Sequence, residues 1–243
     1  MKLIKTAAVG FMLAAFLLGC EKKSGLEGTV VDCRGNPLAG VRIIARQVEE
    51  VVGYERFDTI SEPDGYFMFD ELYPNAAYEL TATANGATTG TLLKVESGAK
   101  GLTYSIPQPI AVRFYFSSDG TTLFDSKTGL MWARKAVVAG KQMNLEEAMS
   151  WVYNLELGGH RDWRLPTKEE LEAFITAGGA NPANYFNALG VTSVPNPAST
   201  WYWSSSSYTE RSNYAWIVAL WDGSASYDFK GRNYDVWPVR AGQ

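Results

Sequence analysis

Few side chains in this chain are suited to catalysis or metal binding. The 243 residues include one histidine, His160, and two cysteines, Cys20 and Cys33. This is too few for a structural Cys/His zinc site or a disulfide framework. No serine or cysteine nucleophile signature lies near His160, and no histidine lies near Cys33 to activate its thiol. We therefore expect no catalytic residue, no bound metal and no cofactor, although the carboxylates by composition alone leave a glycosidase-like pair open.

Cys20 has a different chemistry because of what precedes it. Lys2 and Lys5 are followed by an apolar run from Ala7 to Leu18 and then by Gly19-Cys20. The run is shorter than the roughly 20 residues that a membrane-spanning helix needs, and the pattern is typical of a secretory signal. It resembles a bacterial lipoprotein signal over residues 1–20, which implies acylation of Cys20 and a membrane anchor. The alternative is an ordinary signal peptide in which Cys20 is incidental.

The resemblance to lipoproteins also predicts which membrane holds the protein. Glu21 follows the cysteine, and by comparison with lipoprotein sorting in Gram-negative bacteria this residue favours the outer membrane over retention in the inner one.

The formal net charge is −4, whereas nucleic-acid-binding domains are usually strongly basic. We expect a membrane partner through Cys20 and no nucleic acid.

Composition divides the rest of the chain into two domains. All eight tryptophans lie at or beyond Trp132, and Pro107 and Pro109 mark an extended connection. The predicted domains are residues 21–106 and 111–243, joined by a linker at 107–110.

The first domain has the pattern of short strands separated by turns. Strands are predicted at 27–32, 41–47, 66–69 and 78–84, and Pro63-Asp64-Gly65 is a turn signal. The order of these turns and strands resembles the carboxypeptidase regulatory-like, or transthyretin-like, β-sandwich over residues 25–106. That family implies a stalk without catalytic residues.

The second domain mixes strands and helices. Strands are predicted around 114–116 and 123–134, a helix from 144 to about 157, and a second helix that starts at the capping box of Thr167 and Glu170. Residues 178–197 are predicted to be a loop. A tight hairpin follows, with strands at 215–220 and 224–229, and 234–240 forms a closing strand.

Five motifs in this domain resemble the Lcl C-terminal domain family. They are FDSKTGLMW (124–132), GGHRDWRLPT (158–167), YWSSS (202–206), AWIV with Asp222-Gly223 (215–223) and VWPVR (236–240). The family is known from bacterial surface proteins, including the carbohydrate-binding end of a collagen-like adhesin. Its Arg-Leu-Pro-Thr element also resembles the C-type-lectin-like fold. The expected fold is thus an all-β N-terminal sandwich followed by an α+β C-type-lectin-like domain. The calcium-binding motifs of animal lectins are matched only in part, at residues 194–196 and 221–223.

Aromatic and polar side chains between residues 201 and 234 are the candidate ligand-binding residues. Such rings make large contacts at low entropic cost. The candidates are Trp201, Tyr202, Tyr208, Arg211, Trp221, Asp222, Arg232 and Tyr234, and the segment also holds Tyr214, Tyr227 and Lys230. A second set is expected to maintain the architecture instead: Trp132, Asp162, Trp163, Arg164, Pro166, Trp203 and Arg240. Trp151 and Trp216 are expected in the core.

The function that these observations favour is a lipid-anchored envelope protein that presents a lectin-like domain for glycans or surface polymers. The alternative is a structural or assembly component that binds another envelope protein. An enzyme acting on envelope polysaccharide ranks third.

Overall fold

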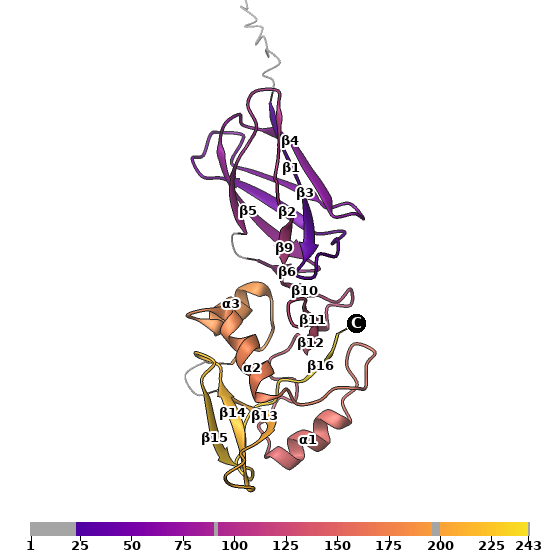
Figure 1. The fold of residues 1–243 in the computed structure, drawn as a ribbon, viewed down its shortest axis with the longest axis vertical. Helices are drawn as coiled ribbons and strands as arrows, with labels where there is room; N and C mark the ends of the chain where they lie inside the picture. The colour runs from indigo at the N-terminus through magenta and orange to yellow at the C-terminus, as the bar shows by residue number, and fades with distance from the viewer. Residues whose placement is uncertain (1–22, 90–91, 196–199, 243) are drawn as a thin grey trace, which may run out of the picture.

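The computed structural model describes residues 23–89, 92–195 and 200–242. In it, two domains follow one another along the long axis of the molecule, and the C-terminal domain lies at the end remote from Lys23 (Figure 1). The predicted order, an all-β sandwich followed by an α+β domain, is confirmed. Cys20, the predicted lipidation site, lies outside the described residues.

In the described part of the first domain, the strands form two sheets. One has the order β4 (Tyr66–Leu72), β1 (Ser24–Asp32) and β8 (Thr103–Ser105), with β9 (Ile110–Val112) also paired to β1. The other has the order β3 (Arg56–Ile60), β2 (Arg42–Gln47), β5 (Ala77–Ala84) and β6 (Ala87–Thr88), with β7 (Leu93–Glu96) also paired to β5. Every second residue of β5 is buried, so each sheet presents one face to the core between them.

The strand β1 runs parallel to both β8 and β9. Leu26 is opposite Tyr104 in the first ladder, and Val31 is opposite Ala111 in the second. Ile110 and Val112 pack in the core of the sandwich. The sandwich therefore extends beyond residue 106 and takes in the end of the segment predicted as a linker.

The two domains contact each other directly. Cys33 N donates to Ser126 Oγ at 3.0 Å, and Asn85 Nδ2 donates to the Phe116 carbonyl at 2.9 Å. Ala87 of the sandwich is fully buried in the core of the C-terminal domain.

Within the described residues of the C-terminal domain, the strands form two antiparallel sheets, and three α-helices pack with them. The first sheet has the order β10 (Phe114–Phe116), β11 (Thr122–Asp125), β12 (Leu130–Ala133) and β16 (Val239–Ala241), and the second has the order β13 (Trp201–Ser207), β14 (Tyr214–Ala219) and β15 (Ala225–Phe229). The helices are α1 (Leu145–Tyr153), α2 (Lys168–Ile175) and α3 (Pro182–Leu189), and a 3₁₀ turn covers Thr176–Gly178. The closing strand is shorter than predicted, because before Val239 this segment makes only isolated bridges.

The helix starts follow the sequence signals closely. Thr167 caps α2, and Asn144 caps α1, each in a complete capping box with the glutamate three residues later. The predicted end of α1 near residue 157 is wrong: Asn154 closes the helix, and its side-chain amide donates to the Ser150 carbonyl at 2.8 Å.

The helix α3 lies in the segment predicted as a loop, and that prediction is wrong. Asn181 accepts a hydrogen bond from Asn184 N and Pro182 occupies the first turn, where its missing N–H costs nothing. Phe186 and Leu189 bury the inner side of the helix.

Aromatic rings fill the core that the second sheet packs against. Trp132 stacks on Phe174 with ring centres 3.9 Å apart, and Trp237 meets Phe174 and Phe186 edge to face. Burial of rings of this size dominates the packing energy of a small domain. It gives α2 and the strand β14 a rigid support.

Candidate ligand-binding surface

One face of the second sheet is lined by aromatic side chains. In the ladder between β14 and β15, Tyr214 is opposite Phe229, and Trp216 is opposite Tyr227. Side chains of a strand alternate between its two faces. These four rings therefore share a face, whereas the intervening Ala215 and Ile217 point into the core.

Tyr208 completes this group of rings. Its ring stacks on that of Tyr227 with centres 3.9 Å apart and planes 9° from parallel. Trp216 meets Tyr208 at 5.4 Å and Tyr227 at 5.8 Å, both edge to face. Tyr227 is 40% exposed and Phe229 46%. We call Tyr208, Tyr214, Trp216, Tyr227 and Phe229 the aromatic face.

Charged groups border the aromatic face. Lys168, at the start of α2, places Nζ 4.5 Å from the centre of the Trp216 ring, and Arg211 lies 5.4 Å from the centre of the Tyr214 ring. Both are cation–π distances. The Tyr208 hydroxyl donates to Glu210 Oε2 at 2.8 Å, and this hydrogen bond raises the pKa of Tyr208 to about 12. The phenol is therefore neutral at physiological pH.

A polar pocket of about 600 Å³ lies where β15 ends. It is lined by Asp228, Gly231, Arg232, Asn233 and Tyr234. The Tyr234 hydroxyl donates to Asp228 Oδ2 at 2.5 Å, and burial, followed by this bond, raises the pKa of Tyr234 to about 12. Asp228 is opposite Ala215 in the ladder, so this pocket opens on the other side of the sheet from the aromatic face.

Trp201, Trp221 and Asp222 form a third location, at the far end of the hairpin. The two indoles meet edge to face with ring centres 4.7 Å apart. Hydrogen bonds from the Ser224 side chain and then from the Ser224 backbone lower the pKa of Asp222. In the backbone bond, Ser224 N donates to Asp222 Oδ1 at 2.8 Å. This carboxylate holds the turn between β14 and β15.

Tyr202 is not available to a ligand, so its assignment as a binding residue needs correction. Its side chain is fully buried against Trp237, with ring centres 5.4 Å apart. The register places it beside Val218, on the part of the sheet that the domain core covers. Burial raises the pKa of this phenol well above its usual value, and among the described residues its hydroxyl has no hydrogen-bond partner.

The seven other predicted candidates occupy three separate places. Tyr208 and Arg211 belong to the aromatic face, Arg232 and Tyr234 to the polar pocket, and Trp201, Trp221 and Asp222 to the hairpin end. Phe229 and Lys168 were not among the predicted binding residues. Trp216, which was expected in the core, is partly exposed on the aromatic face. Trp151, also expected in the core, is partly buried and packs against a core cluster. The useful signal was the two-residue spacing of Tyr214 with Trp216 and of Tyr227 with Phe229.

Several of the residues expected to maintain the architecture join separate segments of the domain through ion pairs. The buried Arg240 donates through Nε to Asp162 Oδ1 at 2.7 Å, and this bond holds the pKa of Asp162 below its usual range. Arg164 donates to both carboxylate oxygens of Glu170, each at 2.7 Å.

Further hydrogen bonds within the domain come from two buried indoles, and another reaches the turn before α2. Trp163 Nε1 donates to the Leu157 carbonyl at 3.1 Å, and Trp203 Nε1 donates to the Met143 carbonyl at 2.8 Å. The Pro166 carbonyl accepts from Ser205 N at 2.8 Å, which joins the turn before α2 to β13.

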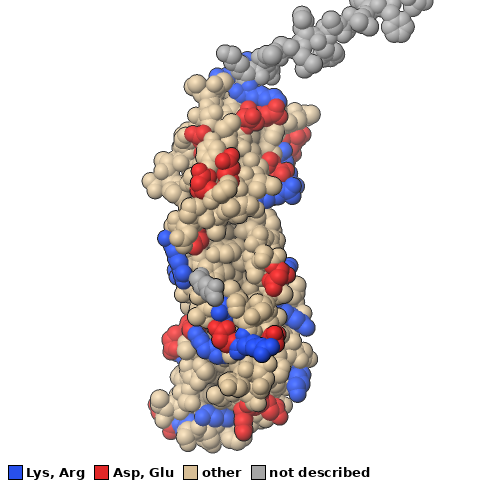
Figure 2. Space-filling view, turned by 90° about the vertical axis from the view of Figure 1, so that its right-hand side faces the viewer, with Lys and Arg blue, Asp and Glu red and all other residues tan. Residues whose placement is uncertain are grey.

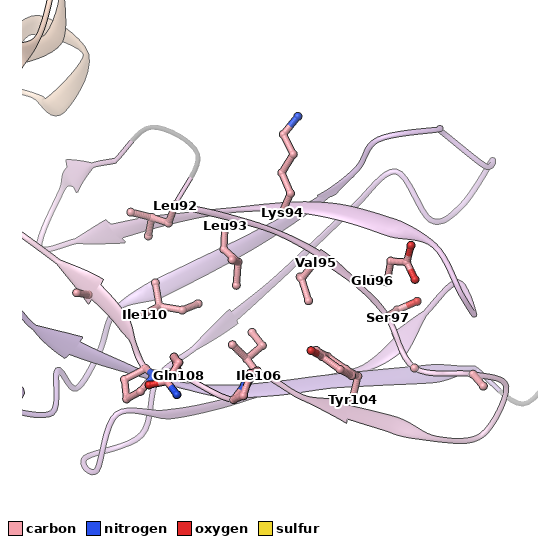
Figure 3. A pocket seen from close by; sticks show the side chains of 15 residues that line it. Leu92, Leu93, Lys94, Val95, Glu96, Ser97, Tyr104, Ile106, Gln108 and Ile110 are labelled. Carbon is pink, nitrogen blue, oxygen red and sulfur yellow. The ribbon is translucent and has the colours of Figure 1, made fainter.

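The first domain contains an apolar groove of about 890 Å³ between β7 and residues 104–111 (Figure 3). Leu93, Val95 and Ile106 point into it, whereas Lys94 points away from it. Lys94 Nζ is 2.6 Å from Glu79 Oε1. The lining residues offer apolar contact, and we find no pair of opposed carboxylates among them.

Within residues 23–89, 92–195 and 200–242, no group of three or more His, Cys, Asp or Glu side chains is placed to hold a metal ion. No helix in the same ranges is long and apolar enough to cross a membrane.

Comparison with known families assigns both domains. Residues 121–240 match the model of the Lcl C-terminal domain. The C-terminal domain is an Lcl C-terminal domain. Residues 25–106 match the carboxypeptidase regulatory-like domain, as expected for the sandwich. The aromatic face and the polar pocket thus both lie within the Lcl C-terminal domain. The chain matches no curated protein. The two kinds of domain together point to a surface or adhesion-type protein.

Proposed function

We propose that this chain is a lipid-anchored envelope protein whose Lcl C-terminal domain binds glycans through the aromatic face. The observation that carries the proposal is the stacked pair of Tyr208 and Tyr227 with Trp216 set edge-on against both. These contacts fix the rings before any ligand arrives, so binding loses little side-chain entropy. The apolar face of a sugar ring packs well against aromatic rings held in this way.

The bordering polar groups support a neutral or acidic glycan. Lys168 and Arg211 offer N–H donors beside the rings, and Glu210 is engaged by the Tyr208 hydroxyl. Sugar hydroxyls and carboxylates accept hydrogen bonds from such cationic groups. The proposal needs no catalytic step and no cofactor.

The anchoring part of the proposal rests on the lipoprotein-like leader and on Cys20. Acyl chains hold a protein at a membrane because each buried methylene contributes about 0.8 kcal/mol. Replacing Cys20→Ala should release the protein from the detergent phase into the soluble fraction of the cell envelope. Retention of the variant in the detergent phase would overturn the anchor. Fractionation of outer from inner membrane would test the expected location.

A glycan array with the soluble form tests the binding part. Tyr227→Ala removes one half of the stacked pair and should weaken capture about tenfold, or about 1.4 kcal/mol, the scale of a contact residue. Tyr153→Ala is the matched control, because Tyr153 is an 80% exposed tyrosine on α1. Arg211→Ala should weaken capture as well, whereas Asp222→Ala and Arg232→Ala, in the other two places, should not.

The pattern of these variants also separates the alternatives. Loss in Arg232→Ala with Tyr227→Ala unaffected would move the site to the polar pocket. If no glycan is captured and Tyr227→Ala instead abolishes co-purification of an envelope protein, the assembly role replaces the glycan-binding role.

A further inference from the structure

The end of the sandwich remote from the Lcl C-terminal domain gathers several loops around the start of the described chain. The ladders pair Ser24 with Leu72, Gln47 with Tyr78 and Ala77 with Glu96. The loops that follow β2, β4 and β7 therefore all lie at the end where β1 begins (Figure 1). We call Lys23 and the loops 48–55, 73–76 and 97–102 the tether end.

Direct contacts tie these loops together. Gly101 N donates to the Lys23 carbonyl at 2.9 Å, and Asn75 N donates to the Gly98 carbonyl at 3.1 Å. The rings of Tyr54 and Tyr73 meet edge to face at 5.2 Å. The tether end is thus one continuous surface built on the ends of paired strands.

Large apolar side chains are exposed on this surface. Val52 is 92% exposed, Leu102 63%, Val48 49% and Tyr73 38%. Single exposed apolar residues are ordinary on a protein surface, but a group of them on adjoining loops marks an interaction site. Tyrosines beside them have the amphipathic character that suits the boundary between lipid and water.

The charges of the tether end are of both signs. Lys23 pairs with Glu71 at 2.7 Å. Figure 2 shows basic and acidic side chains side by side at this end of the molecule. The loops of the tether end also hold Lys100, Glu49, Glu50 and Glu55, and Asp70 and Glu71 of β4 border them. Acidic groups outnumber basic ones, so this surface suits a zwitterionic lipid surface better than an anionic one.

The position of Cys20 supplies the partner. Only Glu21 and Lys22 separate it from Lys23, and an extended residue spans at most about 3.5 Å, so the acylated residue lies within about 10 Å of Lys23. We propose that the tether end rests in the headgroup layer of the bilayer, with Val52 and Leu102 inserted among the lipids. This inference depends on the proposed acylation of Cys20. It orients the molecule with the Lcl C-terminal domain directed away from the membrane.

The test uses the acylated full chain reconstituted into phosphatidylcholine vesicles. In a Cys33→Ser background, an environment-sensitive fluorophore is attached to a cysteine at one of three positions, through Val52→Cys, Leu102→Cys or Ile60→Cys. Ile60 is the matched control because it is 60% exposed but is opposite Arg42, at the other end of the sandwich. Vesicle flotation is measured in the same samples.

Insertion predicts a blue shift and quenching by brominated lipid for the probes at positions 52 and 102, and neither for the probe at position 60. Replacing phosphatidylcholine in part by phosphatidylglycerol should reduce both effects at low salt. Equal behaviour of the three probes in protein that floats would overturn the inference and leave the anchor standing. Protein that does not float would overturn the anchor and the inference together.

Discussion

Trp163 offers the sharpest test of how the Lcl C-terminal domain is held together. Its indole is 3% exposed and packs in a core cluster with Val152, Leu165 and Trp203. Trp163→Ala removes this contact and leaves a cavity, and substitutions of this kind cost about 3–5 kcal/mol. The lost hydrogen bond adds little, because the Leu157 carbonyl also accepts from His160 N at 3.1 Å and so keeps a partner.

The assay follows from the distribution of tryptophans. All eight lie at or beyond Trp132, so tryptophan fluorescence, excited at a wavelength that tyrosine does not absorb, reports during denaturation on the Lcl C-terminal domain alone. The expected loss corresponds to a fall in Tm of about 10–20 °C for a domain of this size. Trp163→Phe retains most of the packing and should cost far less.

Trp221→Ala is the matched control because its indole is only partly buried. A Trp163→Ala domain that unfolds within about 1 kcal/mol of the parent would refute the reasoning, since the cluster would then have closed around the missing ring.

Three further predictions concern charge and domain structure. Asp162→Asn should destabilise the domain near neutral pH in urea titrations. Because the hydrogen bond from Arg240 lowers the pKa of Asp162 in the folded state, the difference from the parent should vanish as the pH falls through that lowered pKa. Asp235 has the opposite sign: burial raises its pKa despite the hydrogen bond from Gln142, so its ionisation opposes folding, and Asp235→Asn should raise stability at pH 7, with a gain that disappears in acid. Residues 111–243 should unfold cooperatively as an isolated fragment by calorimetry, at a lower temperature than in the full chain because Ala87 and Asn85 no longer cover that core; an unfolded fragment would mean that the two domains are one folding unit.

Local signals made part of this fold predictable. The capping box of Thr167 and Glu170 involves residues three apart, so the start of α2 could be located from the sequence alone. The segment before α3 is rich in glycine and asparagine, and this composition obscured the helical spacing of Phe186 and Leu189. Pro107 and Pro109 correctly signal extended chain, but pairing of Ile110 with Val30 joins residues far apart in the sequence and leaves no local trace.

The candidate site was harder to predict than the fold for a related reason. Tyr202 and Trp216 are both aromatic residues on strands of one sheet, and their local sequences do not distinguish them. Tyr202 lies under the domain core, whereas Trp216 lies beyond it, beside Lys168 of α2. Only the placement of α2 across the sheet decides which ring is buried and which remains open.

The parallel pairing of β1 with β8 and β9 has a mechanical consequence. A molecule held near Lys23 and loaded at its C-terminal domain is pulled at the first residue of β1 and beyond the last residue of β9, in opposite directions along neighbouring strands. Such a force shears the ladder, so its evenly spaced hydrogen bonds share the load and must break together. A force perpendicular to the strands would instead break these hydrogen bonds one at a time. Stretching single molecules between these two ends should therefore require more force than stretching them between Lys23 and the β4–β5 loop.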